Sequence, residues 1–496
     1  MINWGTLIPI IIYFIFMYFI GFYANSLNRK ASLAKGATGD TYMEEYMTGG
    51  RDTGGFVLAM TLVATYLSAG SFIGGPGTAY THGLAWVFLA MAQMPTGYFT
   101  LAVLGKKFAI ISRKVNANSI TDFLKARYES HAVYILASLS IVFFLTAAMA
   151  AQLIGAARLL QGSTGLSYTT ALIFFAATVV VHTAVGGFKG VTLNDTMQGI
   201  VMAISTLALF IMTVVKGGGV TNIIQTMKGI NPGAISPFGV QEGFMTMPYV
   251  TSFWILVGFA VVGLPAISQR AMSYKDTKSL KMGIKYGTVV SIVLLLGMHL
   301  VGAFGMTLVS GIESGDLVVP TLSTMLFSPV LAGIVLAGPL AAVMSTLDSQ
   351  LLVVVGAIIN DLAVNYVKPS LKDDQKQTQR LLNISTFVVG IVIVLLALDP
   401  PELMVWLNLF ASAGQISTFL WPTVLGLYWK RANKQGALAG MIAGIAMYMF
   451  SNYFWKNPLG MHPIAISVAV SLIAFVAVAL MTEKPSDRLV AKFWGV

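Results

Sequence analysis

The spacing of its charged side chains is the strongest constraint on how this chain can fold. Long runs of the sequence contain no Asp, Glu, Lys or Arg, and one membrane-crossing helix needs only about 20 apolar residues. Charged residues make up 10% of the 496 residues, against about 25% in soluble globular domains. A water-soluble fold of this size could not cover its surface with so few charges, so the sequence predicts an all-α polytopic membrane protein.

The charge-free runs predict thirteen membrane helices. The run 53–105 is too long for one crossing, so the chain should turn back near Thr81-His82-Gly83. The start of the chain lacks the basic segment and cleavage site of a secretory signal, so the first apolar stretch is expected to remain as a helix. The predicted helices are 5–26, 55–80, 84–111, 130–160, 166–187, 191–216, 248–270, 282–310, 326–362, 381–398, 402–428, 436–455 and 462–482.

Basic residues divide unequally between the two sides of this arrangement. Alternating the loops places all but four of the 30 Lys and Arg on one side, with Arg270 counted at its boundary. The positive-inside rule makes that side cytoplasmic, so the N-terminus should lie outside a cell membrane and the C-terminus inside. The net charge of +11 then orients the protein and does not indicate a nucleic-acid partner. The four exceptions are Arg158, Lys216, Lys228 and Lys456.

Two predicted helices contain glycine and proline where a regular helix cannot continue. One carries the run from Gly70 to Gly77 and the other carries Gly263-Leu264-Pro265. Proline removes a backbone donor and clashes with the preceding turn, and irregular backbone inside a membrane is tolerated where it lines a cavity. The helix end before a break offers carbonyls to a cation and the one after it offers amides to an anion. We therefore expect cation-binding carbonyls at Ala64 and Leu67, and anion-binding amides at 75–78 and after Pro265.

The two broken helices head successive blocks of five helices. This arrangement is typical of inverted-repeat secondary transporters, although two kinked packing helices are the alternative. The sequence predicts one transmembrane domain, 1–496. Within it, 5–26 precedes a first repeat at 55–216, an inverted second repeat occupies 248–428, and two helices trail at 436–482.

A stripe of small and hydroxyl residues lies on the predicted 326–362 helix. Its hydroxyls, set opposite two free carbonyls, would form an oxygen cage suited to a weakly held monovalent ion. The alternative is that the hydroxyls bond back to carbonyls of their own helix. The stripe consists of Ala342, Ser345, Thr346 and Ser349.

Three aspartates fall in or near predicted spans. Asp348 lies near the middle of its span with no Lys or Arg close by in sequence, so it must be protonated, paired or bound to a cation. Asp195 is shallower and could see water at the cytoplasmic edge. Asp361 lies at a helix end, where a structural role is expected.

Buried amides offer a second set of polar groups. They could bind substrate hydroxyls or bond between helices, and the sequence leaves both open. These amides are Gln93, Gln152, Asn408 and Gln415.

Other classes of function find no support in the sequence. The chain has no cysteine, its histidines lack metal-ligand spacing, and no Gly-Lys-Ser/Thr phosphate loop occurs, so ATP is not the expected energy source. Without a recognisable catalytic constellation, we expect neither an enzyme nor a cofactor.

Several stretches are similar to one family along nearly the whole chain, from about residue 5 to 480. The chain resembles the sodium/solute symporter family and, within it, the bacterial sodium/pantothenate symporters. The stretches are 59–62, 71–77, 104–109, Gly186-Gly187-Phe188, 193–199, Ser273-Tyr274-Lys275-Asp276, Met344-Ser345-Thr346, Trp406-Leu407-Asn408-Leu409 and 425–429.

The resemblance implies a LeuT-type five-plus-five inverted repeat with one preceding and two trailing helices. It also assigns sites. The principal sodium site falls on Ala64, Leu67, Ala342, Ser345 and Thr346. Some members hold a second sodium at positions matching Asp195, Ser345, Asp348 and Ser349, and here Asp348 replaces a hydroxyl, so that this position could bind sodium or a proton. Substrate contacts are expected from Ser71, Gln93, Asn408 and Gln415.

The function expected from this resemblance is sodium-coupled import of a small carboxylate-bearing solute, pantothenate, by alternating access. A second cation would make transport electrogenic. Other solutes, namely proline, a sugar or a short carboxylate, are the alternatives, followed by a channel or a transporter-like sensor. Tyr66 stands where proline-transporting relatives carry an aspartate, which argues against proline.

Overall fold

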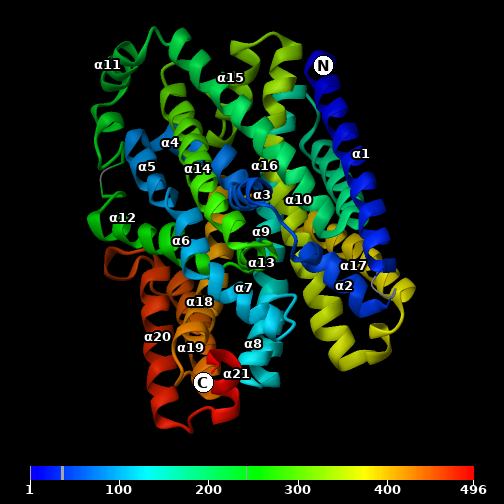
Figure 1. Cartoon of the computed structure of the whole chain (residues 1–496). Helices are drawn as coiled ribbons and strands as arrows, with labels where there is room; N and C mark the ends of the chain where they lie inside the picture. Colours follow the sequence, from blue (N-terminus) through cyan, green and yellow to red (C-terminus); the bar gives the residue numbers. More distant parts are fainter. Residues whose placement is uncertain (1, 35–37, 242, 496) are drawn as a thin grey trace.

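The computed structural model describes residues 2–34, 38–241 and 243–495, and within them the chain forms one helical bundle (Figure 1). The ends of the predicted domain, residues 1 and 496, and part of the predicted loop 27–54 lie outside the described residues. The α-helices are α1 (Trp4–Ala34), α2 (Gly39–Thr48), α3 (Gly55–Tyr66), α4 (Gly75–His82), α5 (Leu84–Ala90), α6 (Thr96–Val103), α7 (Gly105–Lys114), α8 (Ile120–Tyr128), α9 (His131–Thr164), α10 (Tyr168–Lys216), α11 (Val220–Ile230), α12 (Met247–Phe253), α13 (Pro265–Ser273), α14 (Thr277–Gly305), α15 (Val318–Leu326), α16 (Pro329–Gly356), α17 (Gln375–Leu396), α18 (Met404–Tyr428), α19 (Lys434–Tyr453), α20 (Pro463–Met481) and α21 (Asp487–Trp494).

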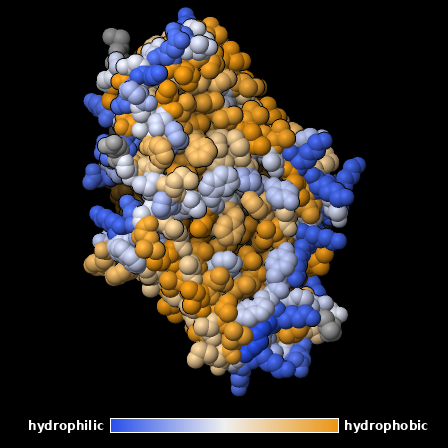
Figure 2. All heavy atoms as spheres, turned by 90° about the vertical axis from the view of Figure 1, so that its left-hand side faces the viewer, coloured by the Kyte–Doolittle hydropathy of each residue, from blue (hydrophilic) through white to orange (hydrophobic). Residues whose placement is uncertain are grey.

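The prediction of an all-α polytopic membrane protein is confirmed. Among the described residues, 8 helices are long and apolar enough to cross a membrane, and two bent pairs raise the number to 10. Three further predicted spans are also helical: Tyr168–Ala184, α18 and α19. A non-helical glycine, Gly187 (φ 56°, ψ −167°), divides α10 where the sequence separates two spans. Figure 2 shows a broad hydrophobic face with hydrophilic residues gathered toward its margins, as expected of a surface that meets lipid.

The chain turns back where the sequence predicts it. α4 ends at His82, and Gly83 adopts a φ of +73° before α5 begins. A Cβ at this position would lie 2.3 Å from the carbonyl oxygen of Ala234, so glycine is needed both for the dihedral angle and for the close approach. The predicted single helix 84–111 is wrong in detail, because it is interrupted near Pro95, which cannot donate a backbone hydrogen bond, and again near Leu104.

Several short helices lie outside the predicted spans. α11 buries Ile223 and Met227 and exposes Val220 and Ile230. Such segments carry charges or are too short to cross a membrane, so a search for long charge-free runs passes over them. The segments of this kind are α2, α8, α11, α15 and α21.

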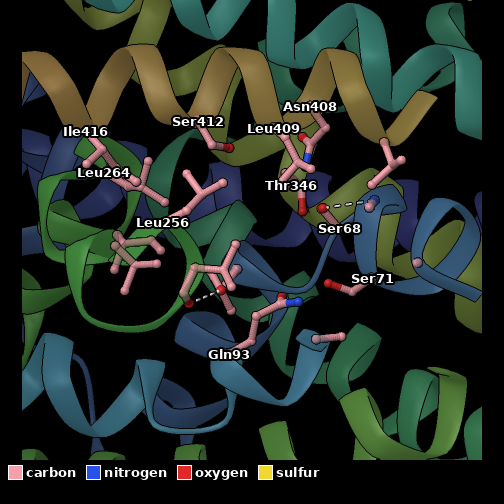
Figure 3. A pocket seen from close by; sticks show the side chains of 18 of the residues that line it. Ser68, Ser71, Gln93, Leu256, Leu264, Thr346, Asn408, Leu409, Ser412 and Ile416 are labelled. Carbon is pink, nitrogen blue, oxygen red and sulfur yellow. Dashed lines mark hydrogen bonds between the residues drawn. The ribbon is translucent and has the colours of Figure 1, made fainter. Parts of the chain in front are cut away.

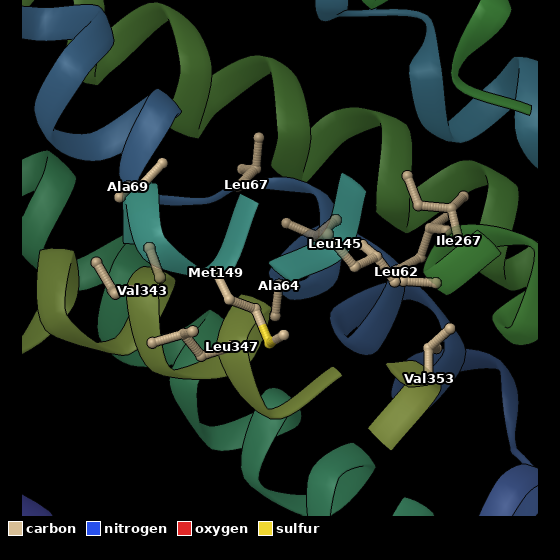
Figure 4. Packing of buried hydrophobic residues seen from close by; sticks show 14 of the residues in the cluster. Leu62, Ala64, Leu67, Ala69, Leu145, Met149, Ile267, Val343, Leu347 and Val353 are labelled. Atoms are coloured by element: carbon tan, nitrogen blue, oxygen red, sulfur yellow. The ribbon is translucent and has the colours of Figure 1, made fainter. Parts of the chain in front are cut away.

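The centre of the bundle surrounds the first broken helix. α3 packs against α10, α14 and α16, and α9 packs against α16 and α18. Figure 4 shows Ala64 and Leu67 beside Val343 and Leu347 of α16, with Met149 of α9 close by. All five side chains are fully buried, so α3 ends among closely packed apolar side chains.

A short backbone bridge joins the chain just before α3 to the chain just after α13. The amide of Thr53 donates to the carbonyl of Ser273, and the amide of Lys275 donates to the carbonyl of Thr53, both at 3.1 Å. The two segments therefore pair like neighbouring parallel strands, at Thr53 and Tyr274. This bridge ties together the ends of the two broken helices, which the sequence predicts to belong to different repeats.

Candidate functional site

The first broken helix bends by 67° between α3 and the segment that begins at Gly70. α3 ends at Tyr66, and Leu67 takes extended dihedral angles (φ −80°, ψ 106°). The amides released by the break have side-chain partners. The Ala69 amide donates to Gln152 Oε1 at 2.7 Å, and the Gly70 amide donates to Ser68 Oγ at 3.1 Å. These two amides are thus satisfied from within the protein, as a membrane interior requires.

The break lies earlier in the sequence than the glycine–proline run predicts. Helix resumes as a π-helical segment, η2 (Gly70–Gly74), and continues through α4 to His82. The Gly75 amide donates to the Gly70 carbonyl, so the prediction of free amides at 75–78 is wrong. The reason is that Pro76 falls in the first turn of α4, where a missing donor costs little.

The second broken helix bends by 49°. α12 continues through a π-helical segment, η5 (Trp254–Phe259), and a 3-10 segment, η6 (Ala260–Gly263), before α13 begins at Pro265. Leu264 is extended (φ −82°, ψ 119°). Here the break falls at the proline, as the sequence predicts, because Pro265 can begin a helix but cannot continue one.

Hydroxyls of α16 meet the carbonyl end of α3. The Ser345 hydroxyl lies 2.8 Å from the Ala64 carbonyl oxygen, and the Thr346 hydroxyl lies 3.4 Å from the same oxygen. Both hydroxyls also lie 3.0 Å from the carbonyl of Ala342 on their own helix. The structure therefore brings together four of the five residues of the predicted principal cage in direct contact, and Leu67 follows at the start of the break.

These contacts are compatible with both interpretations of the hydroxyl stripe. Each hydroxyl bonds back to its own helix at the Ala342 carbonyl, as the alternative predicts. The same oxygens form a set of neutral hard ligands for a monovalent cation. In that arrangement the carbonyls would bind the cation in place of the hydroxyl O–H donors, and the hydroxyl oxygens would bind it too. The side chains are buried, with Ser345 0% and Thr346 3% exposed.

A cavity lies beside this cage, between the two breaks. All four predicted substrate-binding residues line it, together with Ser68, Ser412 and Thr346. Figure 3 shows Asn408 and Ser412 of α18 on one side of the cavity and Ser71 and Gln93 on the other. Among the described residues, its lining contains no Asp, Glu, Lys or Arg, so polar recognition there rests on amides, hydroxyls, backbone and the rings of His299 and Trp86. The four residues are Ser71, Gln93, Asn408 and Gln415.

The amide side chains divide into two kinds. Gln152 is fully buried and connects the break to α18, because it also donates to Asn408 Oδ1 at 3.0 Å. Gln415 donates to the Ala411 carbonyl of its own helix at 3.3 Å. Gln93 is only partly buried and points into the cavity (Figure 3). The sequence left open whether such amides bind substrate or join helices, and Gln152 joins helices.

Asp348 is paired within the protein, one of the three outcomes that the sequence allows. Its Oδ2 lies 2.9 Å from His182 Nδ1, and its Oδ1 accepts from the Thr183 hydroxyl at 2.5 Å. Both partners lie on α10, which packs against α16, and all three residues are buried. His182 in turn contacts Asn194. No local pattern in the sequence predicts this pair.

Asp195 also has a charged partner, one that the sequence assigned to a loop boundary. Its Oδ2 accepts from the Thr61 hydroxyl at 2.5 Å and lies 3.5 Å from Arg270 Nη2. The Arg270 side chain is fully buried within the protein. The alternative that Asp195 sees water is wrong, since its side chain is 0% exposed. Ser349 completes this cluster by contacting Arg270 Nη2.

Asp361 has the structural role that the sequence predicts. Its carboxylate accepts from Thr121 at 2.6 Å and from Tyr134 and Ser138 at 3.2 Å each. These contacts join the end of the α16 span to α8 and α9.

Comparison with known proteins identifies the family of this chain. The family model described as the sodium:solute symporter family matches residues 46–444. The chain belongs to the sodium:solute symporter family. As a member of a transporter family it is a sodium-coupled solute symporter and not an enzyme.

Two bacterial members of the sodium:solute symporter family are similar over nearly their whole length. The sodium/pantothenate symporter of Escherichia coli is 45% identical over 470 residues, covering 95% of both chains. The sodium/pantothenate symporter of Haemophilus influenzae is 41% identical over 490 residues, covering 99% of this chain and 98% of the relative.

A solved structure confirms the fold of this symporter. A sodium-coupled sialic acid symporter in a substrate-bound outward-open state superimposes with a TM-score of 0.77 at 20% identity, covering 97% of this chain and 99% of that one. The LeuT-like architecture implied by the resemblance is thereby confirmed.

Proposed function

We propose that this symporter imports pantothenate together with sodium by alternating access. The substrate follows from two full-length relatives that are sodium/pantothenate symporters, at 45% and 41% identity. Sequence similarity at this level supports a shared substrate class. The shape and chemistry of the cavity support pantothenate as the specific substrate.

The cavity offers the mixture of surfaces that pantothenate needs. The molecule has two hydroxyls flanking a dimethyl-substituted carbon, then an amide and a terminal carboxylate, so it requires several hydrogen-bond partners beside an apolar wall. Ser71, Gln93 and Asn408 supply hydroxyl and amide groups, and Phe253 and Leu256 supply apolar surface. Small-molecule sites commonly combine a mostly apolar lining with a few placed polar groups.

The observation that carries the proposal is the position of Thr346. Its side chain lines the cavity and also contacts the Ala64 and Ala342 carbonyls of the cage. A sodium ion held there would lie beside the substrate and offset the carboxylate charge in a cavity whose described lining carries no Lys or Arg. Substrate and ion would then raise each other's affinity by the same factor, since coupling between sites is reciprocal.

The proposed orientation places the N-terminus outside the cell and the C-terminus in the cytoplasm. It rests on the unequal distribution of Lys and Arg between the loops and on the positive-inside rule. In this orientation α3 and α13 are the cytoplasmic halves of the two broken helices. Sodium at the cage would join α3 to α16 and favour the outward-open state.

The test is uptake of radiolabelled pantothenate into vesicles that contain the purified protein, with a sodium, lithium or proton gradient imposed separately. We expect concentrative uptake with the sodium gradient. Unlabelled proline, sugars and short carboxylates compete in parallel assays. Uptake of pantothenate that does not respond to sodium would refute coupling, and displacement by another solute at lower concentration would reassign the substrate. Saturation of uptake excludes a channel.

The side chain at position 66 weighs against proline as the substrate. Tyr66 lines the cavity, and its hydroxyl donates to the Val257 carbonyl of the second broken helix at 2.8 Å. A neutral side chain already bonded to backbone cannot offer the negative charge that suits an amino group. Pantothenate carries no amino group, so this wall of the cavity suits it better.

A further inference from the structure

Arg270 lies at the meeting point of four helices. Its guanidinium contacts Asp195 of α10, Thr61 of α3 and Ser349 of α16, and Nη1 also donates to the Ala266 carbonyl of its own α13 at 3.1 Å. The side chains of Arg270 and Asp195 are each 0% exposed. This cluster lies outside the cavity, and the transport steps described above do not use it.

The groups around the guanidinium are the ones expected to hold a second coupling cation. Nη2 contacts both the Asp195 carboxylate and the Ser349 hydroxyl, which are two of the predicted ligands. A sodium ion binding there would need the same oxygen atoms. A guanidinium satisfies them instead with directed N–H donors and a permanent positive charge.

Asp348, the other predicted carboxylate ligand, is engaged elsewhere. It contacts His182 and Thr183 of α10, so it does not complete a site with Asp195. The far side of the guanidinium faces an aromatic ring, with the guanidinium carbon 5.4 Å from the centre of Phe188. Such a contact favours a cation and encloses the charge.

The charge of the cluster is already balanced. One carboxylate and one guanidinium sum to zero in a site without solvent exposure, where an unpaired charge is costly. A sodium ion added to the same oxygens would leave a net positive charge beside Arg270. Asp195 Oδ1 has no hydrogen-bond partner within the described part of the chain. If a sodium ion displaced the guanidinium, this free oxygen would be its first ligand.

We propose that the Arg270 guanidinium takes the place of a second coupling cation in this symporter, so that one sodium ion is coupled to each substrate molecule. The inference rests on the proposed function for its substrate but not for its ion count. With a monovalent anion as substrate, a cycle with one sodium ion moves no net charge. Uptake is then independent of membrane potential, contrary to the electrogenic transport that the sequence suggests.

The first test counts ions on the purified full-length protein without any substrate. Binding of ²²Na⁺ at saturation is expected to give one ion per protein. Two ions per protein would overturn the inference and leave the proposed function intact. If pantothenate is not transported at all, the proposed function fails, and the ion count still decides the inference.

The second test measures the flux of ²²Na⁺ against that of labelled pantothenate in vesicles. We expect one sodium per pantothenate and the same initial rate at zero and at inside-negative potential. A ratio of two, with uptake that accelerates at inside-negative potential, would overturn the inference.

Variants of Arg270 test whether its guanidinium occupies the place of a second sodium ion or serves only to hold the helices together. Arg270→Gln frees the Asp195 carboxylate, so the ion count should rise from one to two. Asp195→Asn/Arg270→Gln removes both charges and should return the count to one. Arg270→Lys keeps a positive charge and should also bind one. A count of one for Arg270→Gln would overturn the inference.

Arg127 offers a matched control for the substitution of Arg270. Arg127 is also fully buried, but it bonds to the Gly426 and Trp429 carbonyls far along the chain, so Arg127→Gln should still bind one sodium ion. If Arg270→Gln does not fold, the double variant and the wild-type count carry the test. Two ions bound by either of them would overturn the inference.

Discussion

The side-chain oxygen of Gln152 accepts a hydrogen bond from the backbone amide of Ala69 at 2.7 Å. This contact places a residue of α9 at the open end of the first broken helix. The same side chain donates to Asn408, so one buried glutamine connects the break to a wall of the substrate cavity. The conformation of the loosened backbone therefore depends on a helix from outside the broken pair.

Replacing this glutamine should weaken transport without removing the fold. Gln152→Leu leaves the Ala69 amide buried and unpaired, which costs about 1–3 kcal/mol, and it frees the Asn408 side chain. We expect the substrate concentration for half-maximal uptake to rise roughly tenfold, which corresponds to about 1.4 kcal/mol. Gln161→Leu, at an exposed position of the same helix, is the control. Equal effects from both variants would contradict the assigned role.

The hydroxyl cage predicts a loss of sodium dependence. Ser345→Ala with Thr346→Ala removes the two side-chain oxygens that face the Ala64 carbonyl. The sodium concentration for half-maximal uptake should rise by roughly tenfold or more, since each tenfold loss of affinity corresponds to about 1.4 kcal/mol. Thr386→Ala removes a hydroxyl that bonds to its own helix carbonyl at Leu382 and should leave sodium dependence as it is. Unaltered sodium dependence in the double variant refutes the cage.

Close packing between α4 and α14 predicts a severe effect at one glycine. A Cβ at Gly302 would lie 2.1 Å from the carbonyl oxygen of Pro76, and backbone cannot move aside as a side chain can. Gly302→Ala should lower the stability by about 1–3 kcal/mol, seen as a lower unfolding temperature in detergent. Gly229→Ala, where a Cβ meets nothing within 4 Å, should leave that temperature equal or slightly higher. A Gly302→Ala protein as stable as wild type would show that the helices separate easily.

A second ion pair, at the far end of α9, predicts a rescue. Arg158 Nη1 lies 2.5 Å from Asp316 Oδ2, and Asp316 is buried. Arg158→Gln should lower the unfolding free energy by about 3 kcal/mol, because it leaves a buried carboxylate unpaired. Adding Asp316→Asn removes that charge and should restore much of the loss, as a double-mutant cycle would measure. Additive losses in the cycle would mean that the two side chains do not interact.

Residues close together in the sequence carried most of the successful predictions. Helical spacing puts the Ser345 and Thr346 hydroxyls on one stripe, and a helix break exposes carbonyls near Ala64. That this stripe meets Ala64, 281 residues away, depends on tertiary packing. The turn at Gly83 followed from a charge-free run too long for one crossing. Such inferences need only local geometry and the thickness of the bilayer.

The contacts between the buried aspartates and their partners could not be predicted in the same way. His182 and Asp348 meet only because α10 and α16 pack with a particular rotation about their axes, which no local pattern specifies. Arg270 offers a signal that counting charges in loops overlooks. It follows Pro265 by five residues, or roughly 7.5 Å of helix, so a break at mid-depth must leave the guanidinium inside the membrane.

The position of the first break was mistaken for a related reason. The run from Gly70 to Gly77 contains the expected helix breakers, yet the π-helical turn before Pro76 accommodates the proline. The chain loosens instead at Leu67, where the sequence contains neither glycine nor proline. Tertiary contacts from Gln152 stabilise that conformation, and they come from a distant part of the chain.

The backbone bridge between Thr53 and Tyr274 constrains how this end of the symporter can move. The two segments that it joins run directly into α3 and out of α13. Neither half-helix can slide along its axis or swing outward without dragging the other. A conformational change that opens this side of the protein would therefore move α3 and α13 together, because two backbone hydrogen bonds join their ends.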